Sequence, residues 1–174
     1  MADRRDLSSW LDGGASDPDP SRRPAESQAR GQRLGLPASG SGSLASLGRR
    51  FAALAIDWVA CLLIAGAFFP VDREAFFLTR GSTTATLGIF ALENVLLVGS
   101  IGHTLGHRLV GLRVRRVIPT APAADQERLA VGAPGFIAAL LRTLLLCLVI
   151  PAVVWDPDGR GLHDRAAGTA IVRR

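Results

Sequence analysis

Three ionisable side chains each stand alone inside a long apolar stretch, and their chemistry is that of groups that hold or pass a proton or a cation. They are Asp57 within residues 51–69, Glu93 within residues 84–101 and Arg142 within residues 135–155. A charge at the centre of a membrane-spanning helix costs on the order of 3 kcal/mol, so it normally faces a partner or a polar pathway. The pattern therefore predicts a buried polar cluster of Asp57, Glu93 and Arg142.

Two roles are open for such a cluster. Two acids and one base leave one negative charge unbalanced, and a proton, a metal cation or a rim arginine such as Arg50 could balance it. The functional interpretation is a proton or cation pathway, because intramembrane ionisable groups commonly serve transport. The structural interpretation is a static ion-pair network that fixes how the helices pack.

The apolar stretches that carry these residues have the length of membrane helices. They contain 19, 18 and 21 residues, and about 20 apolar residues cross a bilayer as a helix. Hydrophobic residues make up 48% of the chain and stand in blocks rather than in alternation, which is unlike a soluble amphipathic fold. We predict an all-α membrane protein with helices at about 50–69, 84–101 and 135–155.

The number of full crossings depends on the third stretch. Arginine-rich segments tend to stay in the cytoplasm, which places the N-terminal tail and the 102–134 loop inside and the balanced 70–83 loop outside. A third crossing would carry four further arginines outside, whereas a segment kinked or re-entrant at Pro151 would return them. Against a return, 21 residues span about 31 Å and suffice for a crossing. Those four arginines are Arg160, Arg165, Arg173 and Arg174.

The remaining segments predict little further structure. Residues 1–48 are rich in Ser, Gly, Pro, Asp and Arg, a composition typical of disorder, so we expect a disordered cytoplasmic tail followed by a membrane domain over 49–174. Residues 112–118 have the β-branched content of a strand. A second short strand at 129–131 would complete a small cytoplasmic hairpin.

The basic charge predicts contact with lipid. The net charge is +5, and all 20 basic residues are arginines that flank the apolar blocks, as expected for anionic headgroups and not for nucleic acid. The expected partners are the bilayer and a second copy or another membrane protein. His103 and His107 share a helical spacing, but no further ligands accompany them, so we predict no metal and no cofactor. No nucleophile–base pair indicates an enzyme.

Three segments, taken in order, resemble the RDD family of small bacterial membrane proteins. They are RFAALAID at 50–57, TLGHRLVGLRV at 104–114, and LLR at 140–142 with RGLHDRAAGT at 160–169. The family is named for one arginine and two aspartates, which match Arg50, Asp57 and Asp164. The second segment corresponds to a glycine-rich loop that here contains Gly102, Gly106 and Gly111. His107 is a departure, because lysine is common at that position in similar proteins. The resemblance covers about residues 49–174.

The resemblance implies a location in the bacterial plasma membrane, with the N-terminus in the cytoplasm. It also implies a multi-pass protein of unassigned role, for which we expect a transport component for a small ion or solute. The alternative is a scaffold or accessory subunit whose buried charges only pack helices. If Arg50, Asp57 and Asp164 act together, Asp164 should lie on the cytoplasmic side, since a straight third crossing would leave it about 30 Å from Arg50.

Overall fold

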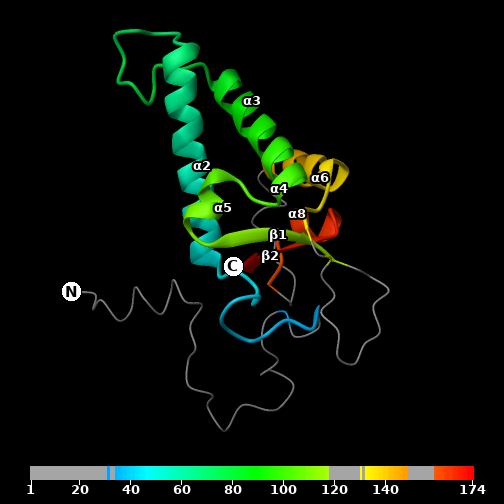
Figure 1. Ribbon diagram of the computed structural model, residues 1–174. Coiled ribbons are helices and arrows are strands. Elements are labelled where there is room, and N and C mark those ends of the chain that lie inside the picture. Colours follow the sequence, from blue (N-terminus) through cyan, green and yellow to red (C-terminus); the bar gives the residue numbers. More distant parts are fainter. Residues whose placement is uncertain (1–30, 32–33, 118–129, 131, 149–158) are drawn as a thin grey trace, which may run out of the picture.

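Two long helices extend from a small sheet in the computed structural model (Figure 1). It describes residue 31 and residues 34–117, 130, 132–148 and 159–174. The elements in chain order are α2 (Leu47–Phe68), α3 (Thr83–Glu93), η2 (Asn94–Val98), α4 (Gly99–Ile101), α5 (Leu105–Leu109), β1 (Leu112–Arg116), α6 (Phe136–Cys147), α8 (Leu162–Ala166) and β2 (Thr169–Arg173). The helices α2 and α3 meet through the 69–82 loop, and α5, α8 and the strands gather at the opposite end.

Two helices are long and apolar enough to cross a membrane. The first is α2, with 22 residues, and the second, Thr83–Ile101, joins α3, η2 and α4 into 19 residues. We call the latter the second span. Only 28% of each apolar window is buried, so most of the apolar side chains point outward, whereas a core helix of a soluble protein would bury most of them. The two predicted helices at 50–69 and 84–101 are thus present.

The second span changes its winding next to Glu93. Its first eleven residues form a regular helix, and Asn94–Val98 then form a π-helical turn. Asn94 is buried there and donates from Nδ2 to the Phe90 carbonyl at 3.0 Å. Such turns bulge the backbone and shift the side chains that follow. The helix ends where Gly102 adopts a left-handed conformation, with φ of 78°.

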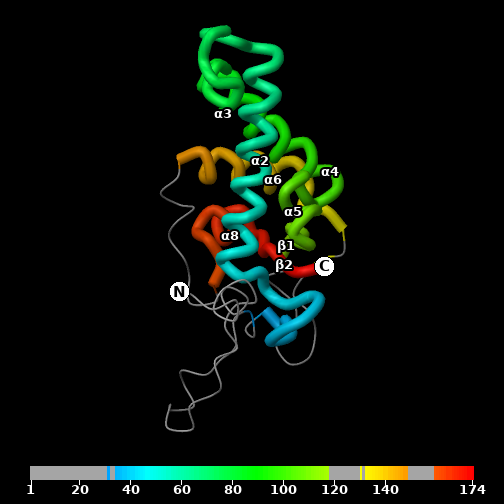
Figure 2. Tube along the Cα trace, turned by 90° about the vertical axis from the view of Figure 1, so that its left-hand side faces the viewer, coloured from blue at the N-terminus to red at the C-terminus, as the bar shows by residue number. Residues whose placement is uncertain are grey.

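The predicted third span is not confirmed. The third helix, α6, has 12 residues, which is about 18 Å of helix and too short for a bilayer. Figures 1 and 2 both show α6 running crosswise to α2. The predicted bend at Pro151 lies outside the described residues.

β1 has a strand partner that the sequence did not predict, and most of the predicted hairpin lies outside the described residues. β1 pairs antiparallel with β2, with Leu112 opposite Arg173 and Val114 opposite Ile171. Of the predicted strand at 129–131 only Ala130 is described, and its N–H donates to the Arg116 carbonyl at 2.8 Å. Packing stabilises the pairing of β1 with β2. The β2 side chains from Thr169 to Val172 are all buried, and β-branched residues suit such a surface.

Part of the segment assigned to the disordered tail is folded. Leu34, Leu36 and Leu44 are buried against Ala170 and Val172 of β2. The backbone joins the sheet as well, because the Ala45 N–H donates to the Ile171 carbonyl at 2.9 Å. These isolated leucines follow no repeat that the sequence could reveal. They are ordered because the sheet offers them an apolar face and a free edge.

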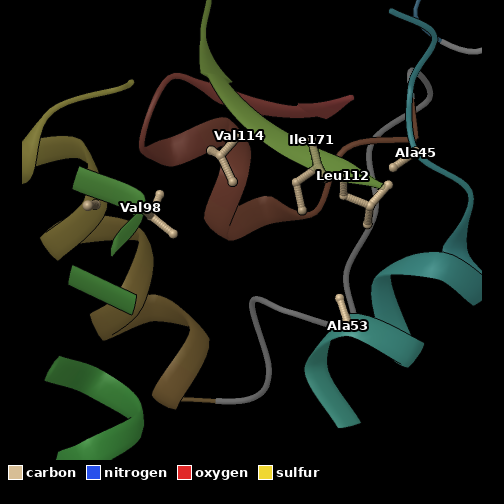
Figure 3. Packing of buried hydrophobic residues seen from close by; sticks show 7 residues of the cluster. Ala45, Ala53, Val98, Leu112, Val114 and Ile171 are labelled. Atoms are coloured by element: carbon tan, nitrogen blue, oxygen red, sulfur yellow. The ribbon is translucent and has the colours of Figure 1, made fainter. Parts of the chain in front are cut away.

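The described core lies where α2, the second span, α6 and the sheet meet (Figure 3). It is made mostly of small and β-branched side chains, which let the backbones approach closely. Its members are Ala45, Ala53, Val98, Leu112, Val114, Ala139 and Ile171. Near this core α5 packs on α2, and α8 packs on α6 and β2, at the end of the molecule where the polar residues collect.

Candidate functional site

Asp57 of α2 holds the beginning of α5. Its carboxyl is 2% exposed. Oδ1 accepts a hydrogen bond from the Gly106 N–H at 2.6 Å, and Oδ2 accepts one from the Thr104 hydroxyl at 2.6 Å. An acid in the first membrane helix therefore reaches a loop that follows the second.

Each N–H group in the first turn of α5 that has no acceptor within the helix donates to a side chain. Thr104 is the N-cap, and its hydroxyl accepts from the His107 N–H at 3.2 Å. The Leu105 N–H donates to Oε1 of Glu93 at 3.4 Å, and the Gly106 N–H donates to Asp57. Helix N-termini favour such negative groups. Acids from both membrane helices thus converge on one turn.

Gly106 permits this convergence. A Cβ at this position would collide with the Ala53 carbonyl oxygen and would lie 2.9 Å from Oδ1 of Asp57. The other predicted glycines of the loop have conformational roles, because Gly102 and Gly111 have φ of 78° and 72°, a region that side chains disfavour. Glycine is thus required for space at Gly106 and for the backbone conformation at Gly102 and Gly111.

Glu93 adjoins Asp57. It is partly buried, its carboxyl interacts with that of Asp57, and the Cys61 thiol donates to Oε2 at 3.6 Å. Within the described part of the chain, no arginine nitrogen lies within 4.0 Å of either carboxyl. The two acids of the predicted cluster are therefore together, without an arginine in salt-bridge contact.

Arg142 lies with Asp164 instead. Its Nε is 2.9 Å from Oδ1 of Asp164. Nη1 of Arg50 and Nε2 of His163 are each 3.6 Å from Oδ2. Asp164 is fully buried. The predicted cluster is thus divided into an acid pair, Asp57 and Glu93, and a cationic group around Asp164, which we call the Asp164 cluster (Arg50, Arg142, His163 and Asp164).

The Asp164 cluster keeps its acid ionised. Burial opposes the charged form, but the guanidinium charges of Arg142 and Arg50, together with the effect of the neighbouring His163 ring, outweigh it and hold the pKa of Asp164 below its ordinary value. The cluster ties α2, α6 and α8 together through one carboxylate. It also brings the predicted motif residues Arg50 and Asp164 side by side, so Asp164 lies at the same end of the molecule as the beginning of α2.

His107 connects the two groups. It is 6% exposed, and its Nδ1 lies 2.6 Å from the Thr104 hydroxyl oxygen. Burial, reinforced by the charge of Arg142, lowers the pKa of His107 to about 3, so its ring is neutral at physiological pH. Burial also lowers the pKa of His103.

Thr104 and His107 belong to the site although no sequence pattern predicted them there. One signal was present, because a threonine three residues before a hydrogen-bonding side chain is a capping pattern, and Thr104 with His107 forms such a capping box. The contact between the Thr104 cap and Asp57 joins residues that are far apart in the sequence. No local sequence pattern can predict it. In the described residues, no group of three or more His, Cys, Asp or Glu side chains is placed to hold a metal ion.

Comparison with known proteins gives one match. The RDD family model matches residues 44–168, a range that runs from the segment before α2 through α8. No curated protein and no solved structure matches the chain.

Proposed function

We propose, from the premise that this chain belongs to the RDD family, that it is a multi-pass membrane protein that binds and releases a proton or small cation at Asp57 as a component of transport. The support for a membrane location is the pair of long helices whose apolar side chains are mostly exposed. The support for the site is the pairing of Asp57 with Glu93.

The observation that carries the proposal is that no arginine of the described residues forms a salt bridge with Asp57. A purely structural pair would set Arg142 against one of the membrane-embedded acids, but Arg142 contacts Asp164. Asp57 is held by two neutral donors, a backbone N–H and a hydroxyl. A buried acid held in this way, beside a second acid, retains the capacity to take up a positive charge and to release it.

The proposed orientation follows from charge. The sheet end contains most of the arginines after the second span, whereas the 69–82 loop balances Asp72 and Glu74 with Arg73 and Arg80. The positive-inside rule therefore places the sheet and the beginning of α2 in the cytoplasm. In this orientation α6 lies at the cytoplasmic interface, with exposed Ile137 on its lipid side.

Transport by purified protein in liposomes tests the proposal. Vesicles contain a pH-sensitive dye, and a gradient of Na⁺ or K⁺ is imposed while internal pH is recorded. We expect the wild type to couple the cation gradient to proton movement and Asp57→Asn to abolish this coupling. Asp72→Asn, in the exposed loop, is the matched control and should behave as wild type. Coupling that persists in Asp57→Asn would contradict the proposal.

A scaffold or accessory role is the second candidate. It is favoured by the fact that the hydrogen bonds of Asp57 also fix α5 and that Asp164 joins three helices. This role predicts that the wild type moves no ion and that Asp57→Asn fails to accumulate in the membrane. The amount of membrane-inserted protein is measured for Asp57→Asn and Asp72→Asn before the liposome assay. This measurement separates the transport role from the scaffold role.

A further inference from the structure

We propose that the Thr104 hydroxyl passes protons between Asp57 and His107, so that His107 is the place at which protons enter or leave the acid pair on the sheet side. This inference rests on the proposed function of Asp57 and adds the path by which its proton is exchanged. The path starts in α2, crosses the N-cap of α5 and ends beside the Asp164 cluster.

The three side chains form one continuous line of short contacts. Oδ2 of Asp57 lies 2.6 Å from Oγ1 of Thr104, and Oγ1 lies 2.6 Å from Nδ1 of His107. All three residues are buried, and Thr104 is fully so. Water therefore does not replace these contacts, and each of them must be a hydrogen bond between the side chains themselves.

The number of hydrogens on the hydroxyl allows two arrangements of this line. Thr104 has one hydroxyl hydrogen and two short contacts. If it donates to Asp57, then Nδ1 of His107 must carry a hydrogen and donate to Oγ1. If it donates to Nδ1, then Asp57 must be protonated and donate to Oγ1. Asp57 ionised with Nδ1 protonated and Asp57 protonated with Nδ1 bare are thus the two states of one line. The Thr104 backbone N–H donates to Nδ1 at 3.4 Å in the capping box, and this bond is made only in the second state.

The conversion between them is a balanced proton transfer. A proton binds Nε2 of His107, the Nδ1–H bond breaks, and that proton joins Oγ1 of Thr104. The original Oγ1–H bond breaks at the same time, and its proton forms an O–H bond on Asp57. Thr104 is unchanged, His107 has exchanged one N–H for the other, and one proton has moved from the sheet side to Asp57. The reverse sequence releases it.

The surroundings of the imidazole suit this relay. The charges of Arg142 of α6, Asp164 of α8, Arg50 of α2 and His103 of the preceding loop act on the His107 ring. Both end states leave the ring neutral, as burial beside two arginines requires. Nε2 makes no hydrogen bond to the described residues, and His107 as a residue is 6% exposed. At the other end of the line, Glu93 and the charge of Arg142 act on Asp57, and Asp57 acts in turn on Cys61 of its own helix.

Nitrogen NMR of the full-length protein in lipid bilayers tests the relay directly. The chain has three histidines, so ¹⁵N-histidine labelling gives a spectrum in which His107 is assigned by its substitution. We expect the wild-type ring to carry its hydrogen on Nδ1 at high pH and on Nε2 at low pH. In Asp57→Asn the amide donates to Oγ1 permanently, so the hydrogen should stay on Nε2 at every pH. Asp72→Asn is the control.

Substitution of the hydroxyl gives the second test. Thr104→Ser keeps the hydroxyl and should keep both the pH-dependent change at His107 and ion-coupled proton movement. Thr104→Val removes it and should lower the rate of proton movement at least ~100-fold, the scale of a positioned proton-transfer group. Thr84→Val, at an exposed position in the first turn of the second span, is the matched control and should leave the rate unchanged.

The outcomes distinguish the relay from the proposed transport function. A His107 ring that responds to Asp57→Asn in a protein that moves no ion would uphold the relay and reject transport. Transport that survives Thr104→Val would reject the relay and leave the function standing. A wild-type His107 whose spectrum is the same in Asp57→Asn would overturn the relay even if Thr104→Val fails to fold.

Discussion

His107 links the charge state of single residues to the stability of the fold. The folded protein buries a neutral imidazole whose pKa is lowered to about 3, whereas the unfolded chain titrates near 6.5. Between these values the unfolded state binds a proton that the folded state does not, so the free energy of unfolding falls as pH falls below 6.5. The stabilising contribution of the neutral ring is complete above that pH.

Acid should therefore destabilise the protein through His107, whose imidazole binds a proton only in the unfolded chain over this pH range. We expect the free energy of unfolding in mixed detergent to be lower at pH 5 than at pH 7 by about 2 kcal/mol on account of His107. In His107→Gln this part of the slope should disappear, while the slope due to His103 remains. Equal slopes in both proteins would show that His107 titrates normally in the folded state.

At the residue scale, the sequence located the charged residues but not their partners. Asp57, Glu93 and Arg142 stand out because each interrupts an apolar stretch, and all three belong to the polar centre of the molecule. The pairing depends on Asp164, which lies in a short polar segment with no apolar background to mark it. Arg142 pairs with Asp164 because α8 packs beside α6.

At the scale of elements, the contact between α2 and α5 determines how the acid is held. Gly106 sits against the backbone of α2 at Ala53, and the hydrogen bond from its N–H to Asp57 needs that closeness. The missing side chain is thus a requirement of helix packing and of the polar site together. Close helix contacts of this type are built on small residues.

Substitutions at two helical glycines should have opposite effects. Gly106→Ala should lower the free energy of unfolding by about 1–3 kcal/mol, because the added methyl group forces α5 away from α2. Gly88→Ala, in α3 with open space around it, should be neutral or stabilise by up to ~1 kcal/mol through helix propensity. Thermal unfolding in detergent measures both. A Gly106→Ala protein as stable as Gly88→Ala would mean that the close approach is absent.

The elements that the sequence predicted well are those that local composition determines. α2 and the second span are continuous apolar segments, and a helix of that length follows from the bilayer they suit. The pairing of β1 with β2 depends on contacts between distant segments. Local β-branched content at 112–118 indicated a strand but not its neighbour.

At the scale of the whole molecule, the sheet joins the middle of the chain to its C-terminal part. β1 follows the second span and β2 follows α6, and they form one sheet beside the beginning of α2. Residue 173 is therefore at the same end as residue 47. Under the proposed orientation, the region after α6 is cytoplasmic, as the arginine distribution also favours.

Labelling in intact bacterial cells checks this arrangement. With both natural cysteines replaced by alanine, a cysteine is introduced as Glu74→Cys or Arg174→Cys, each at an exposed position. A membrane-impermeant maleimide should label Glu74→Cys in intact cells and Arg174→Cys only after permeabilisation. Labelling of both from outside would require a third crossing and would contradict the sheet.

The pairing of Arg50 with Asp164 has a consequence for biosynthesis. The two residues are far apart in translation order, so the first helix enters the lipid before its final counter-ion exists. Under the proposed orientation, the phosphates of the inner leaflet are the anions beside the guanidinium during that interval. We therefore expect headgroups to hold the nascent first helix until the later segment emerges and its carboxylate replaces them.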